Sequence, residues 1–347
     1  MVRAIDFNYV VMRDGADYRT IYPRTGSAPT IRMDDSGEIK TSLSGEFLDP
    51  GEDVSWLTDQ IRPELIIDGT AYPLGIYLPA TVQRAETDAS KIILIEAYDR
   101  CWQVQSHVTE NGKYFPAGTT YLSAIGSLIS ECGITAMAVT DSDLVFSEAR
   151  EWDVGTSNLE IVNQLLSEIN YKSLWFDQNG IAVIEPIAQL RAENIRHVID
   201  DTKADSLVIP GMNRALDIYA APNVFICVCS NADKSGPLVA TAENTNPQSP
   251  LSIARRGRRI AQVIPVENIA SQAALQTYAN RLVTLSMMRG DVISVSTCLL
   301  PDYGVGDVVS LRYGDTLALC VDRAWEMTLA VGGQMNHTLE RVMMNVE

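Results

Sequence analysis

The residues that could perform chemistry are few in this sequence and lie far apart. The three histidines, His107, His197 and His337, fall in three different predicted segments, and none has the cysteine, serine or carboxylate arrangement that marks an active site. The sequence contains no CxxC pair and no Cys/His pair at zinc-finger spacing. The adjacent carboxylates at 34–35 and 200–201 lie in polar sequence typical of solvated turns. Residue types therefore predict neither a catalytic site nor a metal site.

Glycine motifs lead to the same prediction. The stretch Gly155–Leu159 lacks the second glycine of a G-x-S-x-G nucleophile elbow. The sequence contains no G-x-x-x-x-G-K-[ST] and no G-x-G-x-x-G, and Gly304–Gly306 precedes a predicted strand rather than a helix, which indicates a turn. We therefore predict that the protein is not an enzyme and uses no cofactor and no metal.

One dense basic cluster remains as a candidate site, formed by Arg255, Arg256, Arg258 and Arg259. Three interpretations are open: a solvated loop or strand edge paired with local carboxylates, an interface with a neighbouring subunit or acidic partner, and a contact with DNA phosphates. Arginine is the charged residue favoured at interfaces. The DNA interpretation ranks third, because one patch rarely outweighs the field of a chain whose net charge is −17. We expect no specific nucleic-acid binding.

The composition is that of an ordinary globular protein with 46% hydrophobic and 20% charged residues, and 347 residues allow two or three domains. No apolar run approaches the ~20 residues that span a bilayer, and the first ten residues lack a signal peptide's apolar core. We therefore expect synthesis in the cytoplasm and no membrane insertion. The six scattered cysteines are expected to be mostly buried thiols. The acidity fits either simple solubility or the lining of a conduit for DNA, and charge alone does not distinguish them.

The stretch Ser157–Pro186 gives the clearest structural prediction. Ser157 and Glu160 form a capping box before a helix with one apolar face, and Asn170 is a left-handed stop. Two short strands, 174–176 and 181–184, then flank a turn in which Asn-Gly is expected to supply the positive φ angles. Helix, strand, turn and strand within thirty residues predict an α+β unit.

The remaining elements predict β-structure at both ends of the chain. Residues 1–100 contain short strands and almost no helical pattern, and a helix with a C′ residue at Gly133 follows in 101–200. Residues 201–265 contain the predicted strands 215–219 and 224–228 and a polar, exposed loop at 242–250. The longest predicted helix, 268–288, precedes strands at 291–300 and beyond.

Several stretches resemble phage tail hub proteins, the baseplate hub or tail-tip family that also occurs in phage-like contractile injection particles. These stretches are KTSLSGEF (40–47), IRPELIIDGTAYPLGIY (61–77), EAYDR (96–100), INYKSL with the D-x-N-G turn (169–180), ENTNPQSPLSIARRGRRI (243–260) and PDYGVGDVVSL (301–311). The resemblance implies an α+β, mostly β fold, with two tail-tube-like β-barrel domains and an inserted small α/β domain. The expected division is an N-terminal barrel-like domain (1–100), an α/β domain (101–200), a β segment completing or bridging the barrels (201–265), and a helix with a C-terminal barrel-like domain (266–347).

The same resemblance implies a structural role in the virion tail baseplate. Three copies are expected to form a ring that joins the tail tube to the central spike or tail tip and lets DNA pass. The implied partners are the tail tube protein, the spike or tail-tip protein, the tape-measure protein and other baseplate proteins. Two alternatives stay open: a secreted or virion β-protein that binds carbohydrate or cells, and a peptidoglycan hydrolase.

Overall fold

The computed structural model describes residues 3–87, 90–187, 191–215, 221–229, 237–247, 249, 251–266 and 272–342. Part of the predicted strand 215–219 and the first residues of the predicted helix 268–288 lie outside the described residues. The predicted mostly β architecture is confirmed, with helices gathered in the middle of the sequence. In the part of the chain that the structure describes, none of the sheets closes on itself.

The N-terminal residues form two facing sheets. Four strands lie in the order β2-β1-β5-β6 and are β1 (Ile5–Arg13), β2 (Ala16–Ile21), β5 (Gln60–Ile67) and β6 (Thr70–Pro73). The first hairpin has an Asp-Gly turn in which Asp14 and Gly15 both adopt positive φ. The inward residues of β1 and β5, such as Val11 and Ile61, are fully buried.

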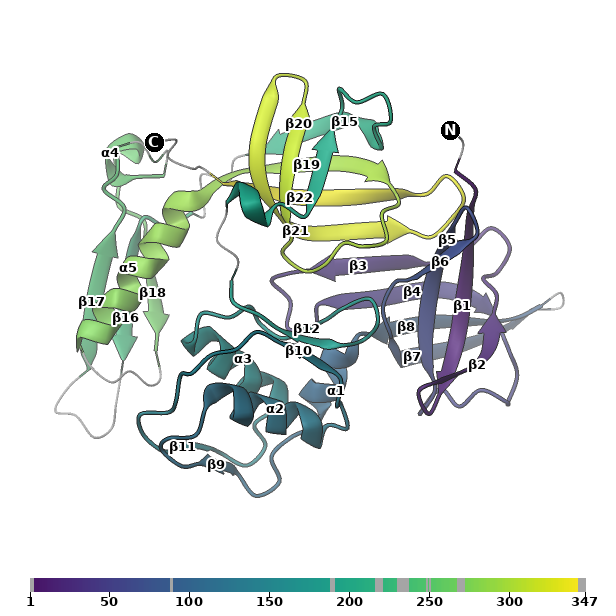
Figure 1. Cartoon of the computed structure of the whole chain (residues 1–347), viewed down its shortest axis with the longest axis horizontal. Helices are drawn as coiled ribbons and strands as arrows, with labels where there is room; N and C mark the ends of the chain where they lie inside the picture. Colours follow the sequence, from purple (N-terminus) through teal and green to yellow (C-terminus); the bar gives the residue numbers. More distant parts are fainter. Residues whose placement is uncertain are drawn as a thin grey trace.

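The second sheet joins the two ends of the chain. Figure 1 shows the purple strand β3 beside the yellow strand β21, and the two pair in antiparallel register from Thr30–Thr328 to Asp34–Ala324. The sheet runs β15-β19-β22-β21-β3-β4-β8-β7, with β20 also on β21 and β14 on β20. Its strands are β3 (Thr30–Asp34), β4 (Thr41–Leu48), β7 (Leu78–Thr87), β8 (Ser90–Tyr98), β14 (His197–Asp200), β15 (Val208–Ala215), β19 (Arg289–Cys298), β20 (Val308–Tyr313), β21 (Thr316–Thr328) and β22 (Gln334–Val342). One hydrophobic core therefore spans residues from both ends.

The middle of the chain folds around a second core. It consists of α1 (Arg100–Ser106), β9 (Lys113–Phe115), α2 (Tyr121–Glu131), β10 (Met137–Val139), β11 (Arg150–Trp152), α3 (Asn158–Glu168), β12 (Trp175–Phe176) and β13 (Ala182–Ile184), followed by a 3-10 turn at Ala192–Asn194. The Ser157 half of the predicted capping box is confirmed, since the Ser157 hydroxyl accepts from the Glu160 amide at 3.1 Å. The predicted left-handed stop at Asn170 is confirmed by its φ of 63°. The predicted Gly133 stop is confirmed as well, with φ 79°.

A third core lies within residues 221–288. Here α5 (Gln272–Met288) crosses one face of the sheet β17-β16-β18 (Figure 1). The strands are β16 (Val224–Cys229), β17 (Leu238–Glu243) and β18 (Ala261–Pro265), and the short helix α4 (Ile253–Arg256) precedes β18. The helix buries Leu275, Ala279 and Val283 against the sheet, a spacing of one helical face. We call this part of the chain the α5 unit.

Two local predictions were wrong in detail. In the hairpin of β12 and β13 only Gly180 has positive φ (72°), because Asp177 Oδ1 accepts from the amides of Asn179 and Ile181 and fixes a different turn. The loop at 242–250 is not simply exposed, since Asn244 is fully buried and donates to Ser249 Oγ at 2.9 Å. Helix α1 was not predicted at all. Five cysteines are buried as expected, whereas Cys298 is exposed.

Candidate functional site

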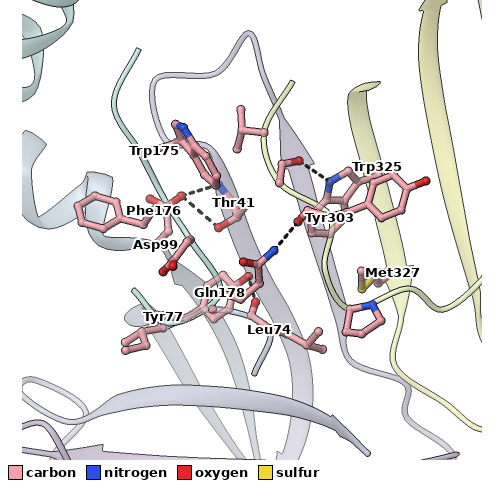
Figure 2. Close-up of a pocket in the computed structure, with 16 residues that line it drawn as sticks. Thr41, Leu74, Tyr77, Asp99, Trp175, Phe176, Gln178, Tyr303, Trp325 and Met327 are labelled. Carbon is pink, nitrogen blue, oxygen red and sulfur yellow. Dashed lines mark hydrogen bonds between the residues drawn. The ribbon is translucent and has the colours of Figure 1, made fainter. Parts of the chain in front are cut away.

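Three parts of the chain, the N-terminal sheets, the middle part and the C-terminal strands, meet at one loop, residues 301–307 between β19 and β20, which we call the junction loop. Its turn is closed by Asp307 Oδ2, which accepts from the Gly304 amide at 2.7 Å, and by Gly306 with φ 63°. From the neighbouring strand β21, Trp325 Nε1 donates to the Gly304 carbonyl at 3.3 Å (Figure 2). The loop is therefore held in one conformation by its own sheet.

The hairpin of β12 and β13 binds to the junction loop on one side. Gln178 Nε2 donates to the Tyr303 carbonyl at 3.0 Å (Figure 2), and Lys172 Nζ donates to the Val305 carbonyl at 3.1 Å. On the other side, the Gln178 carbonyl accepts from the Gly75 amide at 3.0 Å, next to the N-terminal sheets. The D-x-N-G turn thus fastens the middle of the chain to both of its ends.

A small cavity lies among these contacts. Its walls come from all three parts, including Tyr77, Asp99, Trp175, Gln178 and Tyr303 (Figure 2). Its volume is about 30 Å³, which equals one water molecule, whereas sites for small organic ligands occupy roughly 300–1,000 Å³. The geometry suits a packed junction and leaves no room for a substrate.

Two histidines that are distant in sequence meet at the junction loop. The His197 ring stacks on Tyr303 with 3.7 Å between ring centroids and 11° between planes, and the His337 ring lies 4.9 Å from Tyr303. Each histidine has a carboxylate partner: His197 Nε2 lies 3.0 Å from Asp307 Oδ2, and His337 Nδ1 lies 2.7 Å from Asp322 Oδ2. We call these five residues the His–Tyr–Asp cluster.

The His337 end of this cluster has the connectivity of a hydrolase triad. Its Nε2 lies 2.9 Å from Thr297 Oγ1, so a hydroxyl, an imidazole and the Asp322 carboxylate are in line. All three residues are at most 1% exposed, and the Thr297 hydroxyl also donates to the Cys298 carbonyl at 2.8 Å. A nucleophile must reach its substrate, and this hydroxyl is sealed inside the sheet. The arrangement satisfies buried polar groups and stabilises the fold.

The two carboxylates of the cluster differ in protonation behaviour. Burial raises the pKa of Asp307, yet hydrogen bonds from His197 and the Gly304 amide, with a nearby guanidinium, outweigh it, so this pKa lies below its ordinary value. For Asp322 burial is again the largest effect, and the single bond from His337 only partly offsets it, so its pKa is raised. The number of hydrogen-bond donors around each carboxylate therefore decides whether its pKa is lowered or raised.

A wider opening lies beside the cluster, between the junction loop and residues 185–187 and 193–196. It has a volume of about 580 Å³. Its charged side chains pair with one another: Lys172 Nζ lies 2.9 Å from Glu185, and Arg196 lies 3.7 Å from Glu185 and 3.5 Å from Asp307. Such compensated charges fit a surface cleft between two packed parts of the chain. Within the described residues, no group of three or more His, Cys, Asp or Glu side chains could hold a metal ion.

The four candidate arginines lie at the end of the α5 unit. Ser252 caps α4, Gly257 with φ 66° ends it, and Arg255, Arg258 and Arg259 are exposed. Arg259 forms an ion pair with Glu243 at 2.6 Å, and Arg255 Nε donates to the Pro247 carbonyl at 2.9 Å. Arg256 donates to the Ala221 carbonyl. Local pairing thus accounts for part of the patch, and its role as an interface remains a proposal.

None of the helices in the described part of the chain has both the length and the apolar character needed to span a bilayer. No protein-family model matches the sequence, and no curated protein matches it.

Several solved structures share the fold. The tail protein from Neisseria meningitidis MC58 aligns with a TM-score of 0.69 and 12% identity over 96% of both chains. The 43 kDa tail protein of prophage MuSo2 from Shewanella oneidensis aligns with a TM-score of 0.69 and 10% identity, over 97% of this chain and 98% of that one. The E. coli c3393 protein aligns with a TM-score of 0.53 and 7% identity, over 98% of this chain and 77% of that one. It is a component of the type VI secretion system with structural similarity to the T4 tail proteins gp27 and gp5.

At these identities the likeness establishes the fold. The chain has the fold of phage tail proteins over nearly its whole length, as the resemblance in sequence predicted.

Proposed function

We propose that this chain is a structural, non-enzymatic protein of a phage or phage-like tail, located in the virion baseplate. The observation that carries this proposal is the alignment with two tail proteins of nearly equal length over 96–98% of every chain involved. Matches that cover both chains end to end support a shared architecture and not merely a shared domain. The occluded hydroxyl of Thr297 and the small junction cavity support a structural role rather than catalysis.

Within the baseplate, we propose the role of hub: a homotrimeric ring that joins the tail tube to the spike or tail tip and gives passage to DNA. The likeness to c3393, which is structurally similar to the T4 tail proteins gp27 and gp5, supports this more specific role. The expected partners are the tube, spike, tape-measure and other baseplate proteins. Two tube-like domains per copy, one in the N-terminal part and one in the C-terminal part, would let a trimer meet a sixfold tube.

The edges of the large sheet support assembly with other chains. Its outer strands are β7 and β15, and most side chains of β15 are exposed. Strand edges present unpaired backbone groups that neighbouring chains commonly cover. The net charge of −17 is also compatible with a channel wall that must not hold DNA.

The tail location is tested by deleting the gene from a strain that produces the particles. The proposal predicts heads or tubes without a completed baseplate, and antibodies against the protein should label the tip of wild-type tails. Normal infectious particles in the deletion strain, or labelling away from the tail, would refute it. Hydrolysis of purified peptidoglycan by the protein would refute the non-enzymatic role.

A further inference from the structure

The sheet of the α5 unit has one covered and one open face. Side chains alternate along a strand, so Phe225 and Cys227 of the central strand β16 face α5. Ile226 and Val228 therefore face the opposite side, where their register partners are Val263 on β18 and Val239 on β17. Figure 1 shows α5 lying across the first face. We call the second face, defined by these four aliphatic side chains, the open face.

The open face is apolar although it is solvent-exposed. Val239 is 48% and Val263 is 62% exposed, while Ile226 and Val228 are half-buried between them. An antiparallel or mixed sheet with one solvated face normally carries polar side chains there. Contiguous exposed aliphatic side chains mark surfaces that contact another protein.

A basic rim borders one end of the open face. Arg258 and Arg259 lie shortly before β18, with Arg255 in the preceding helix α4, and Arg259 is paired with Glu243, which ends β17 on the same face. Residues 221–288 contain six basic and three acidic side chains, whereas the whole chain has a net charge of −17. The α5 unit is therefore opposite in charge to the rest of the chain, which points to a copy of the same chain as its partner.

The middle of the chain offers a matching surface. Residues 139–154, which we call the acidic strip, contain five exposed carboxylates: Asp141, Asp143, Glu148, Glu151 and Asp153. The same segment carries the exposed apolar side chains Leu144, Val145 and Val154, at 52%, 49% and 67% exposure. The one basic residue of the strip, Arg150, is bound to Glu168 at 2.6 Å. The strip thus combines carboxylates with apolar side chains, whereas the open face combines apolar side chains with an arginine rim.

We propose that the open face and its arginine rim bind the acidic strip of a second copy of this chain. Because the two surfaces differ, the contact is heterologous, and repeated heterologous contacts close into a ring when the rotation allows. The apolar side chains would form the dry centre and the arginine–carboxylate pairs the rim, which is the usual anatomy of an interface. This inference rests on the proposed ring of copies and names the surfaces that would build it.

Charge-reversal variants of the full chain test this contact. The basic variant is Arg255→Glu with Arg258→Glu, the acidic variant is Asp141→Arg with Asp143→Arg, and a fourth protein carries both pairs. The control is Arg32→Glu, which reverses an exposed arginine (74% exposed side chain) on the large sheet. Mass is measured by light scattering across a concentration series up to about 100 µM, and circular dichroism checks that each variant is folded.

We expect the wild type and the control to self-associate. The basic variant and the acidic variant should each associate at least about tenfold more weakly, and the protein that carries both pairs of substitutions should recover most of the lost affinity. A wild type that stays monomeric over the whole concentration series overturns the inference. So do basic and acidic variants that associate as strongly as the wild type, or a combined variant whose affinity is not restored. These failures are distinct from failure of the proposed tail location, which antibody labelling of particles tests independently.

Discussion

Without the Asp322 carboxylate, the large sheet should unfold at a markedly lower concentration of denaturant. Asp322 and His337 are both fully buried, and Asp322 Oδ2 is 2.7 Å from His337 Nδ1. Truncation to alanine leaves the imidazole without its partner in a dry interior, a loss of about 3–5 kcal/mol. Asp322→Asn keeps an oxygen that accepts from Nδ1 but loses the charge, so we expect a smaller loss of about 1–2 kcal/mol.

A matched control lies on the same strand. Glu326 of β21 pairs with Arg32 at 2.8 Å, but the arginine side chain is 74% exposed. An exposed pair contributes at most about 1 kcal/mol, so Glu326→Ala should shift the unfolding midpoint only slightly. Urea unfolding followed by circular dichroism measures all three variants, with the slope m compared to confirm that the same surface unfolds. A loss for Asp322→Ala no larger than that for Glu326→Ala would refute the structural role assigned to the cluster.

Three further changes have outcomes that the structure fixes. Ser157→Ala should destabilise the protein by about 1 kcal/mol because the N-cap of α3 is lost, whereas Ser157→Asp keeps a capping side chain and should be close to the wild type. Equal melting temperatures for Ser157→Ala and the wild type would contradict the cap. Gly126→Ala in α2 should stabilise by about 0.5–1 kcal/mol, because an added Cβ meets nothing within 4 Å; a lower melting temperature would be inconsistent with that space. Because the pKa of Asp307 is lowered, its contribution to stability is present above the unfolded value near 3.9 and is lost as pH falls through the lower folded value. Asp307→Asn should reduce the acid-induced loss of stability seen in urea titrations at pH 2–5, and an unchanged pH profile would argue against this lowering.

Helix α3 and the hairpin that follows it were predictable because their determinants are local. Ser157, the apolar stripe behind it and Asn170 lie within one helix length, and capping rules operate over that distance. The predicted Asn-Gly turn failed in one detail, since the Asp177 side chain competes for the backbone amides and selects another turn. Local rules thus gave the elements, and a side-chain hydrogen bond changed the turn.

Elements that depend on distant partners escaped prediction. Helix α1 has seven residues, and its cap Asp99 also accepts from the Thr41 amide at 2.7 Å, in a strand far away in sequence. The His–Tyr–Asp cluster arises only because β14 pairs with β20 and β21 with β22. The sequence places His197 and His337 in separate segments and cannot show that Tyr303 lies between their rings. The four arginines were visible in the sequence, but the apolar sheet face beside them was not.

We propose that copies of this chain form the ring at the end of a tail tube. The most direct measurement is negative-stain imaging of the protein produced together with its tail tube protein, with the mass of the complex measured on the same sample. We expect rings of three copies with a central hole, seated on the end of a tube. Single copies in the images, with no complex formed with the tube protein, would contradict it.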